Sequence, residues 1–305
     1  MSLISHHHLD WLEAESIYII REIIAEAQNP ALLFSGGKDS VVLLALASKA
    51  FQIPDRCLQL PFSLLHVDTG HNYPEVIQFR DQTVAQSGAR LVVAKVEDSI
   101  RKGTVVLAHP NDSRNAAQAV TLLEAIEDYQ FDALMGGARR DEEKARAKER
   151  IFSFRDEFGQ WDPKNQRPEL WSIYNTRLHK NENLRVFPLS NWTELDIWQY
   201  IQRESLALPS IYYAHQREVV QRHNLLVPVT ALTPKKEHEK SSIEWVRFRT
   251  VGDISCTCPV ASQAQTVQQI ILETAQTTVS ERSATRLDDQ LSVAAMEERK
   301  RAGYF

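Results

Sequence analysis

The chain has 305 residues, of which 43% are hydrophobic and 25% are charged, and its formal net charge is −5. This length allows one large domain with an appended region. The acidic balance excludes a protein that coats nucleic acid through bulk charge, and no apolar run approaches the roughly 20 residues that a membrane span needs. Three cysteines cannot complete an even set of disulfides, and no apolar leader follows Met1, so we expect a cytoplasmic protein.

The first half of the chain alternates helix-like and strand-like segments. Helical spacing of apolar residues predicts an amphipathic helix over residues 9–27. Strands are then expected over residues 31–34, 63–67, 90–96 and 131–135, with helices over residues 41–50, 74–87 and 116–129. This alternation predicts an α/β fold with a doubly wound, mainly parallel sheet and helices on both faces. Ligands of such sheets bind outside the carboxyl ends of the strands.

The turn between the first predicted strand and its helix has the composition of a phosphate-binding loop. It reads Ser35, Gly36, Gly37, Lys38, Asp39 and Ser40. The two glycines permit a tight turn and a close approach to a ligand, and free N–H groups at the start of the next helix favour an anion. The common pattern G-x-x-x-x-G-K-S/T is absent here, which disfavours a generic kinase or GTPase. The alternative interpretation is a glycine-rich turn with a solvated lysine.

Polar residues also follow two further predicted strands. Asp68 could accept from a ribose hydroxyl or help to hold Mg²⁺, or it could be an ordinary turn residue before Gly70. Arg139 and Arg140 follow Gly137 after one intervening residue at a strand end, so we expect their guanidinium groups to overlook the same site. If residues 140–150 are helical, their alternating charges also fit a solvated helix with pairs four residues apart.

The rest of the chain has a mixed pattern. We expect a strand over residues 184–187 and a helix over residues 191–201, with Thr193 and Asp196 as a capping box. Two further helices are expected over residues 263–274 and 291–301. Arg247 and Arg249 alternate with apolar residues, and whether they face the site or solvent stays open. The pair Cys256 and Cys258 offers too few ligands for a zinc or iron–sulfur site.

Five blocks together resemble one known family. They are residues 35–40, 66–70, 136–150, 161–171 and 185–198. The loop resembles the S-x-G-x-D-S pyrophosphate loop of adenylylating enzymes, and the whole chain resembles the sulfate adenylyltransferase subunit 2 family, the small catalytic subunits of bacterial ATP sulfurylase. The resemblance implies an adenine nucleotide alpha-hydrolase-like fold and the conversion of ATP and sulfate into adenosine 5′-phosphosulfate and pyrophosphate. It also implies a GTPase large subunit as partner. We expect an ATP-binding domain over residues 1–208 and a C-terminal α+β extension over residues 209–305 that docks this partner.

The reaction that the resemblance implies assigns roles to the candidate residues. We expect ATP to contact Ser35, Gly36, Gly37, Lys38, Asp39, Ser40, Asp68 and Gly137. Asp39 and Asp68 would orient Mg²⁺. We expect the following basic residues to hold sulfate or the charge that develops on the α-phosphate and the leaving group: Lys38, Arg139, Arg140, Lys144 and Arg146. The rival interpretations are a phosphosulfate reductase and a non-catalytic ATP sensor; no cysteine follows Cys258 to serve as the reductase thiol.

Overall fold

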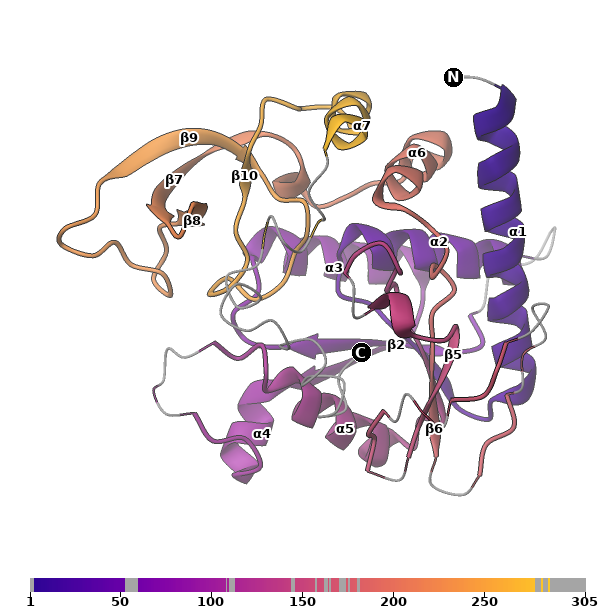
Figure 1. Ribbon diagram of the computed structural model, residues 1–305. Helices are drawn as coiled ribbons and strands as arrows, with labels where there is room; N and C mark the ends of the chain where they lie inside the picture. Colours follow the sequence, from indigo (N-terminus) through magenta and orange to yellow (C-terminus); the bar gives the residue numbers. More distant parts are fainter. Residues whose placement is uncertain are drawn as a thin grey trace.

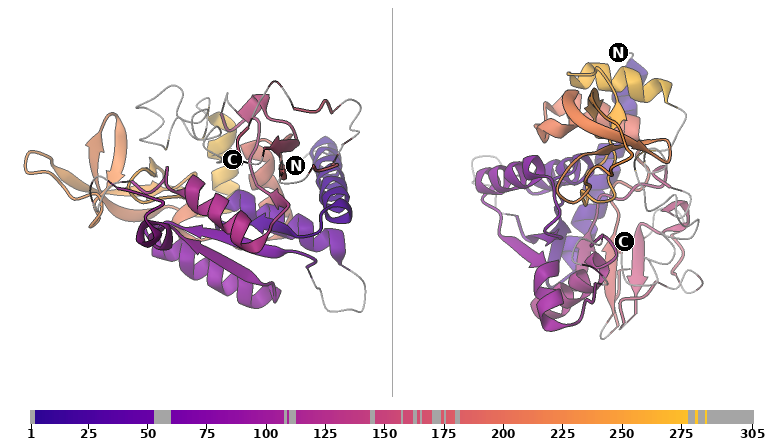
Figure 2. Two further views of the ribbon diagram at one scale, coloured as in Figure 1. Left: turned by 90° about the horizontal axis from the view of Figure 1, so that it is seen from below. Right: turned by 90° about the vertical axis from the view of Figure 1, so that its left-hand side faces the viewer.

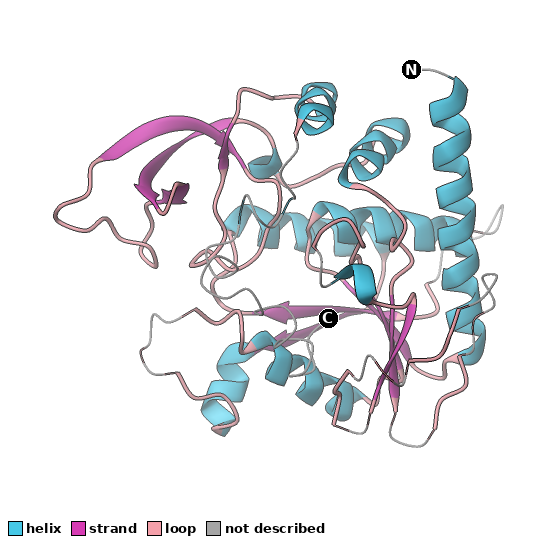
Figure 3. Cartoon of the chain, in the orientation of Figure 1, coloured by secondary structure: helices cyan, strands magenta, loops and turns pink. Residues whose placement is uncertain are grey.

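The computed structural model describes residues 3–52, 60–107, 109, 113–143, 146–156, 158–161, 164, 166–169, 174, 176–179, 182–277, 281 and 285. Figure 3 shows how helices, strands and loops are distributed over these residues. Within the described ranges, every helix is too short or too polar to cross a membrane.

A mainly parallel sheet of six strands lies at the centre of the described residues (Figure 1). In spatial order the strands are β3 (Leu91–Lys95), β2 (Ser63–Asp68), β1 (Pro30–Leu33), β4 (Ala133–Met135), β6 (Asn183–Val186) and β5 (Phe152–Arg155). Only β5 runs antiparallel to its neighbour within this sheet. The chain winds from β1 outward to β3 and then returns to β4 on the other side of β1. The predicted doubly wound sheet is therefore confirmed, and β1 and β4 flank its switch point.

Two helical layers cover the sheet because its strand residues alternate between two apolar cores. Leu32 and Leu64 point into the larger core, whereas Ala31 and Leu65 point into the smaller one. The helices on the side of the larger core are α1 (Leu3–Glu26), α2 (Lys38–Phe51), α3 (Pro74–Ser87) and α6 (Glu194–Glu204). The helices of the opposite layer are α4 (Val96–Lys102) and α5 (Gln118–Tyr129), as Figures 1 and 2 show.

The C-terminal part adds a second, antiparallel sheet beside the larger core. Its strands lie in the order β10 (Val260–Ala261), β9 (Ser241–Arg247), β7 (His215–Arg222) and β8 (Leu225–Pro228). The strands β7 and β9 extend away from the parallel sheet (Figure 1). Helix α7 (Val267–Gln276) packs against α6, and the short 3₁₀ turn η3 (Ser210–Tyr212) leads into β7.

Most expected elements are present with shifted ends, and one charged segment differs. The capping box of α6 is confirmed: Thr193 Oγ1 accepts from the Asp196 N–H at 3.1 Å. The third strand ends at Lys95 because the chain turns into α4 at Val96. The described residues between 140 and 150 form no α-helix, only the 3₁₀ turn η1 (Arg146–Lys148). The helix expected over residues 291–301 lies outside the described residues.

Candidate active site

The loop between β1 and α2 offers backbone donors at the edge of the sheet. Gly36 has a φ of +76°, a left-handed conformation that glycine adopts at little cost. Gly37 precedes α2 in an extended conformation. In the first turn of α2, the N–H groups of Asp39 and Ser40 have no hydrogen-bond partner among the described residues. Free donors at the positive end of a helix dipole attract an anion.

These donors face a cleft of about 200 Å³. Its walls come from the loop, from the ends of β2 and β4, and from the C-terminal part; among them are Ser35, Gly37, Asp39, Ser40, Val67, Gly136, Gly137, Tyr212, Val251 and Asp253. Gly137 lies directly against the start of α2. A Cβ at Gly137 would come within 3.1 Å of the Asp39 carbonyl carbon and 3.3 Å of the Ser40 nitrogen. Glycine therefore allows the two sheet-edge segments to meet.

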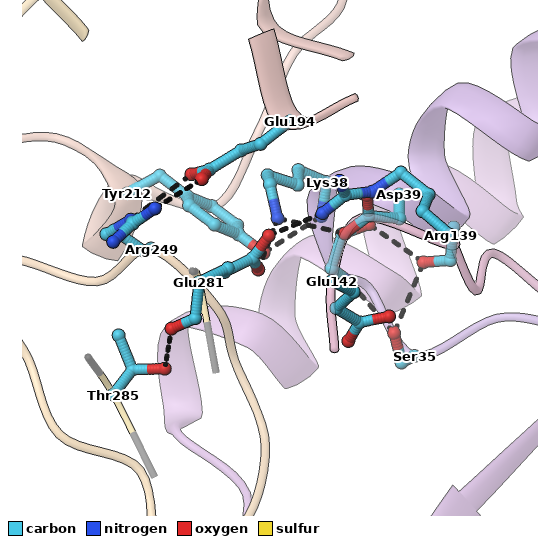
Figure 4. A network of polar contacts seen from close by, with 12 residues as sticks. Ser35, Lys38, Asp39, Arg139, Glu142, Glu194, Tyr212, Arg249, Glu281 and Thr285 are labelled. Atoms are coloured by element: carbon cyan, nitrogen blue, oxygen red, sulfur yellow. Dashed lines mark hydrogen bonds and ion pairs between the residues drawn. The ribbon is translucent and has the colours of Figure 1, made fainter. Parts of the chain in front are cut away.

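Lys38 is fully buried and paired instead of extending into the cleft. Its Nζ lies 2.9 Å from Asp39 Oδ2 and 2.6 Å from Glu281 Oε1, and Figure 4 shows these groups pointing toward one another. Although burial disfavours the charged ammonium, Asp39 and Glu281 raise the pKa of Lys38 above its ordinary value. The main chain of Lys38 is held as well, because its N–H donates to the Tyr212 hydroxyl at 2.9 Å.

Arg139 completes a closed network of charges with Lys38. Its side chain is 1% exposed, with Nε 2.7 Å from Asp39 Oδ1, Nη1 2.5 Å from Asp141 Oδ1 and Nη2 2.5 Å from Glu281 Oε2. Asp39 and Glu281 each bridge Lys38 and Arg139 (Figure 4). Although burial opposes it, the charges of Lys38 and Arg139 lower the pKa of Asp39. The network holds both cations in fixed positions beside the loop.

The other predicted basic residues occupy different places. Arg140 is not among the described residues that line the cleft, and its Nη1 donates to Asn191 Oδ1 at 2.6 Å. Arg146 does line the cleft, with its Nε 3.2 Å from Glu142 Oε2. Its Nη1 is buried without a hydrogen-bond partner among the described residues. Lys144 lies outside the described residues. Arg146 is therefore the predicted arginine that lines the cleft with an available donor.

The two aspartates predicted to hold Mg²⁺ are used in other ways. Both oxygens of Asp39 are bonded to cations, as given above, and Asp68 Oδ1 accepts from the Gly70 N–H at 2.8 Å. Asp68 is also not among the described cleft residues. Over the described part of the chain, no group of three or more His, Cys, Asp or Glu side chains is arranged to hold a metal ion. These residues do not form a metal site by themselves.

Several residues of the site carry no signal in the sequence. Tyr212 and Glu281 reach the loop from the C-terminal part, and Arg249 Nη2 lies 2.5 Å from Glu194 Oε2 beside them (Figure 4). Although burial opposes it, Lys38 and Arg249 lower the pKa of Glu194. The two arginines whose direction was left open above have different partners. Arg249 lies beside the site, whereas the Nε of Arg247 lies 2.8 Å from Oε2 of Glu273 on α7. A local pattern could not have indicated these partners.

Comparison with known proteins identifies the family. Residues 29–259 match the phosphoadenosine phosphosulfate reductase domain family. Sulfate adenylyltransferase subunit 2 of Mycolicibacterium vanbaalenii is 62% identical, and that of Mycobacterium tuberculosis is 61% identical; each alignment covers 98% of this chain and 94% of the relative. Among solved structures, Candida glabrata FMN adenylyltransferase with FMN and AMPCPP aligns with a TM-score of 0.48 and 12% identity over 78% of each chain. On the strength of its close relatives, the chain belongs to the sulfate adenylyltransferase subunit 2 family.

Proposed function

We propose that this chain transfers the adenylyl group of ATP to sulfate, giving adenosine 5′-phosphosulfate and pyrophosphate. A sulfate oxygen attacks the α-phosphorus, the bond from that phosphorus to the oxygen bridging to the β-phosphorus breaks, and pyrophosphate leaves. The observation that carries the proposal is that one cleft holds two separate features suited to anions. These are the N–H groups of Asp39 and Ser40 and the Nη1 of Arg146, which have no hydrogen-bond partner among the described residues.

The loop side of the cleft suits the phosphates of ATP. The N–H groups at the start of α2 are fixed by the helix, so they need no reorganisation when charge moves onto the leaving diphosphate. Lys38 and Arg139 stand behind these donors, where Asp39, Asp141 and Glu281 already balance their two positive charges. Apolar side chains elsewhere in the lining, Leu33, Val67 and Leu122, suit the flat faces of the adenine base.

Arg146 is our candidate for the sulfate contact. Sulfate is a dianion that has no proton to lose at neutral pH, so the reaction needs positive charge and alignment more than it needs a general base. Arg139 is already bound by three carboxylates and Arg140 is bonded to Asn191, whereas Arg146 lines the cleft and has a single carboxylate partner among the described residues, Glu142. A planar guanidinium can hold two sulfate oxygens at once.

Mg²⁺ enters this proposal together with ATP. Magnesium usually keeps several waters and binds through substrate phosphates and one or two carboxylates. This fits a site whose described carboxylates form no metal cluster of their own. Asp68 stays a candidate for a contact to the ion or the ribose, provided that it releases the Gly70 N–H, whereas Asp39 keeps its contacts to Lys38 and Arg139.

The name of the family, subunit 2, implies a partner subunit. We propose that the partner is a GTPase large subunit acting with this chain in the cytoplasm, since the product anhydride is unstable relative to ATP and its formation needs an outside drive. The C-terminal extension is the proposed docking part. On β9, the side chains of Ile243 and Trp245 are 70% and 37% exposed, which favours coverage by another protein.

The decisive experiment is an assay of pyrophosphate release with ATP and sulfate, with and without the partner subunit and GTP. We expect release that depends on sulfate and increases with the partner. A nucleotide sensor would release none. A phosphosulfate reductase would instead form sulfite from phosphosulfate and thioredoxin; Cys256 and Cys258 are both buried here, which disfavours that chemistry.

A further inference from the structure

The carboxylate of Glu281 lies where an oxyanion of the substrate could bind. We propose that Glu281 is an internal competitor, so that the diphosphate part of ATP must take its place on Lys38 and Arg139. This inference rests on the proposed function, because that function brings a polyphosphate to the loop.

The contacts of Glu281 resemble those of a bound phosphoryl group. Its Oε1 lies 2.6 Å from Lys38 Nζ and its Oε2 lies 2.5 Å from Arg139 Nη2. The residue is 3% exposed, so these contacts are shielded from water. An ammonium and a guanidinium that share two oxygens of one group form an arrangement typical of phosphate recognition.

The remaining carboxylates show why Glu281 is the replaceable one. Asp39 already links the two cations, with Oδ2 2.9 Å from Lys38 Nζ and Oδ1 2.7 Å from Arg139 Nε. Asp141 holds Arg139 from another side at 2.5 Å. If Glu281 withdraws, each cation keeps a partner. Positioning of Lys38 and Arg139 therefore does not require Glu281, whereas an incoming anion needs its place.

Electrostatics favour this exchange. Burial raises the pKa of Glu281 to about 7, even though Lys38 and Arg139 pull in the opposite direction. The buried site thus disfavours the ionised carboxylate. A diphosphate carries more negative charge than one carboxylate and is attracted more strongly by the same two cations. Glu281, in turn, recovers full hydration when its carboxylate reaches water.

Withdrawal of Glu281 must also involve its backbone, because a residue exposed by only 3% has no free path to water for its side chain alone. The Thr285 hydroxyl donates to the Glu281 carbonyl at 2.9 Å, and the Cys258 N–H donates to the Thr285 carbonyl at 2.8 Å. A shift at Glu281 is therefore expected to loosen the hydrogen bond at Cys258.

The first test measures binding of inorganic pyrophosphate to the full-length chain by calorimetry. Glu281→Gln removes the competing charge and keeps the shape of the side chain. We expect the affinity for pyrophosphate to rise roughly tenfold, because pyrophosphate no longer has to displace an ionised carboxylate from Lys38 and Arg139. Glu273→Gln is the matched control, since Glu273 pairs with Arg247 on the other side of the extension, and we expect no change. Equal or weaker binding by Glu281→Gln would overturn the proposal.

The second test needs no variant, so it holds even if Glu281→Gln fails to fold. Hydrogen exchange at the Cys258 amide is measured in the unmodified chain with and without pyrophosphate. We expect faster exchange with pyrophosphate, and unchanged or slower exchange contradicts the proposal. Neither readout involves sulfate. A chain that shows both effects but never releases pyrophosphate from ATP and sulfate would therefore refute the proposed reaction alone.

Discussion

The parallel sheet and the C-terminal extension build the same cleft in different ways. The sheet supplies a glycine turn and a helix start that are adjacent in sequence, and it brings Gly137 against them by pairing β1 with β4. The extension supplies Tyr212 and Glu281, which contact Lys38 across 174 and 243 residues. The difference shows that the donors for an anion are a local feature of the chain, whereas the control of the charges behind them is long-range.

Removing the central cation should have the largest effect on activity. We expect Lys38→Gln to lower kcat for sulfate-dependent pyrophosphate release by about 10²–10³-fold, the usual loss for one group that stabilises transition-state charge. Lys49→Gln, at the other end of α2 and paired with Glu13, is the control and should leave kcat unchanged. Thermal melts of both variants check that each one folds. Near-normal turnover by Lys38→Gln would show that the loop between β1 and α2 does not bind the phosphates of ATP.

The sulfate contact should come second. Arg146→Gln is expected to raise the KM for sulfate by roughly ten- to a hundredfold, because a hydrogen bond to a charged group is worth about 1.5–3 kcal/mol. Arg140→Gln is the comparison, since Arg140 is bonded to Asn191 and is not among the described residues that line the cleft. If Arg140→Gln has the greater effect on that KM, sulfate binds elsewhere than Arg146.

A smaller effect is expected where the extension touches the loop. Tyr212→Phe removes the acceptor of the Lys38 N–H and leaves a buried donor unpaired, which costs about 1–3 kcal/mol. We expect a lower urea midpoint and a KM for ATP raised several-fold. Tyr213→Phe alters the neighbouring residue, whose hydroxyl has no hydrogen-bond partner among the described residues, and should change neither value. Identical behaviour of the two variants would mean that the extension does not support the loop.

Variants at the two capping boxes allow the sheet domain and the extension to be compared at positions outside the cleft. Thr193 caps α6 and Thr266 caps α7. We expect Thr193→Ala and Thr266→Ala each to lower the free energy of unfolding by about 1 kcal/mol, measured by urea titration. The KM for ATP should stay constant in both. A change in that KM for either variant would indicate that helix ends outside the cleft also position the site.

The sequence was sufficient for elements that carry their own boundary signals. Helix α3 has the predicted bounds, because Pro74 fits its first turn and Gly88 ends it in a left-handed conformation. The structure of the charged segment after β4 was harder to predict, since its alternating charges fit a solvated helix as well as they fit a loop beside the site. In the structure Arg139 and Asp141 form an ion pair, and the described residues of this segment form no helix other than the 3₁₀ turn η1.

The residues of the site also differ in how well the sequence could predict them. The loop and Gly137 could be placed from glycines at strand ends, and the structure brings both to one cleft. The burial of Lys38 could not be predicted, because it depends on Glu281, which has no motif around it. The distinction between Arg140 and Arg146 was also beyond the sequence, since it depends on the exact path of a few residues with similar charge.

The long separation between Lys38 and its partners has a consequence during synthesis. Chains emerge from the ribosome N-terminus first, at about 5–20 residues per second. The Lys38 ammonium is therefore made well before Glu281, 243 residues later, can pair with it. Until then Asp39, which is made together with Lys38, can pair with that ammonium, and the second carboxylate joins only after most of the chain has emerged.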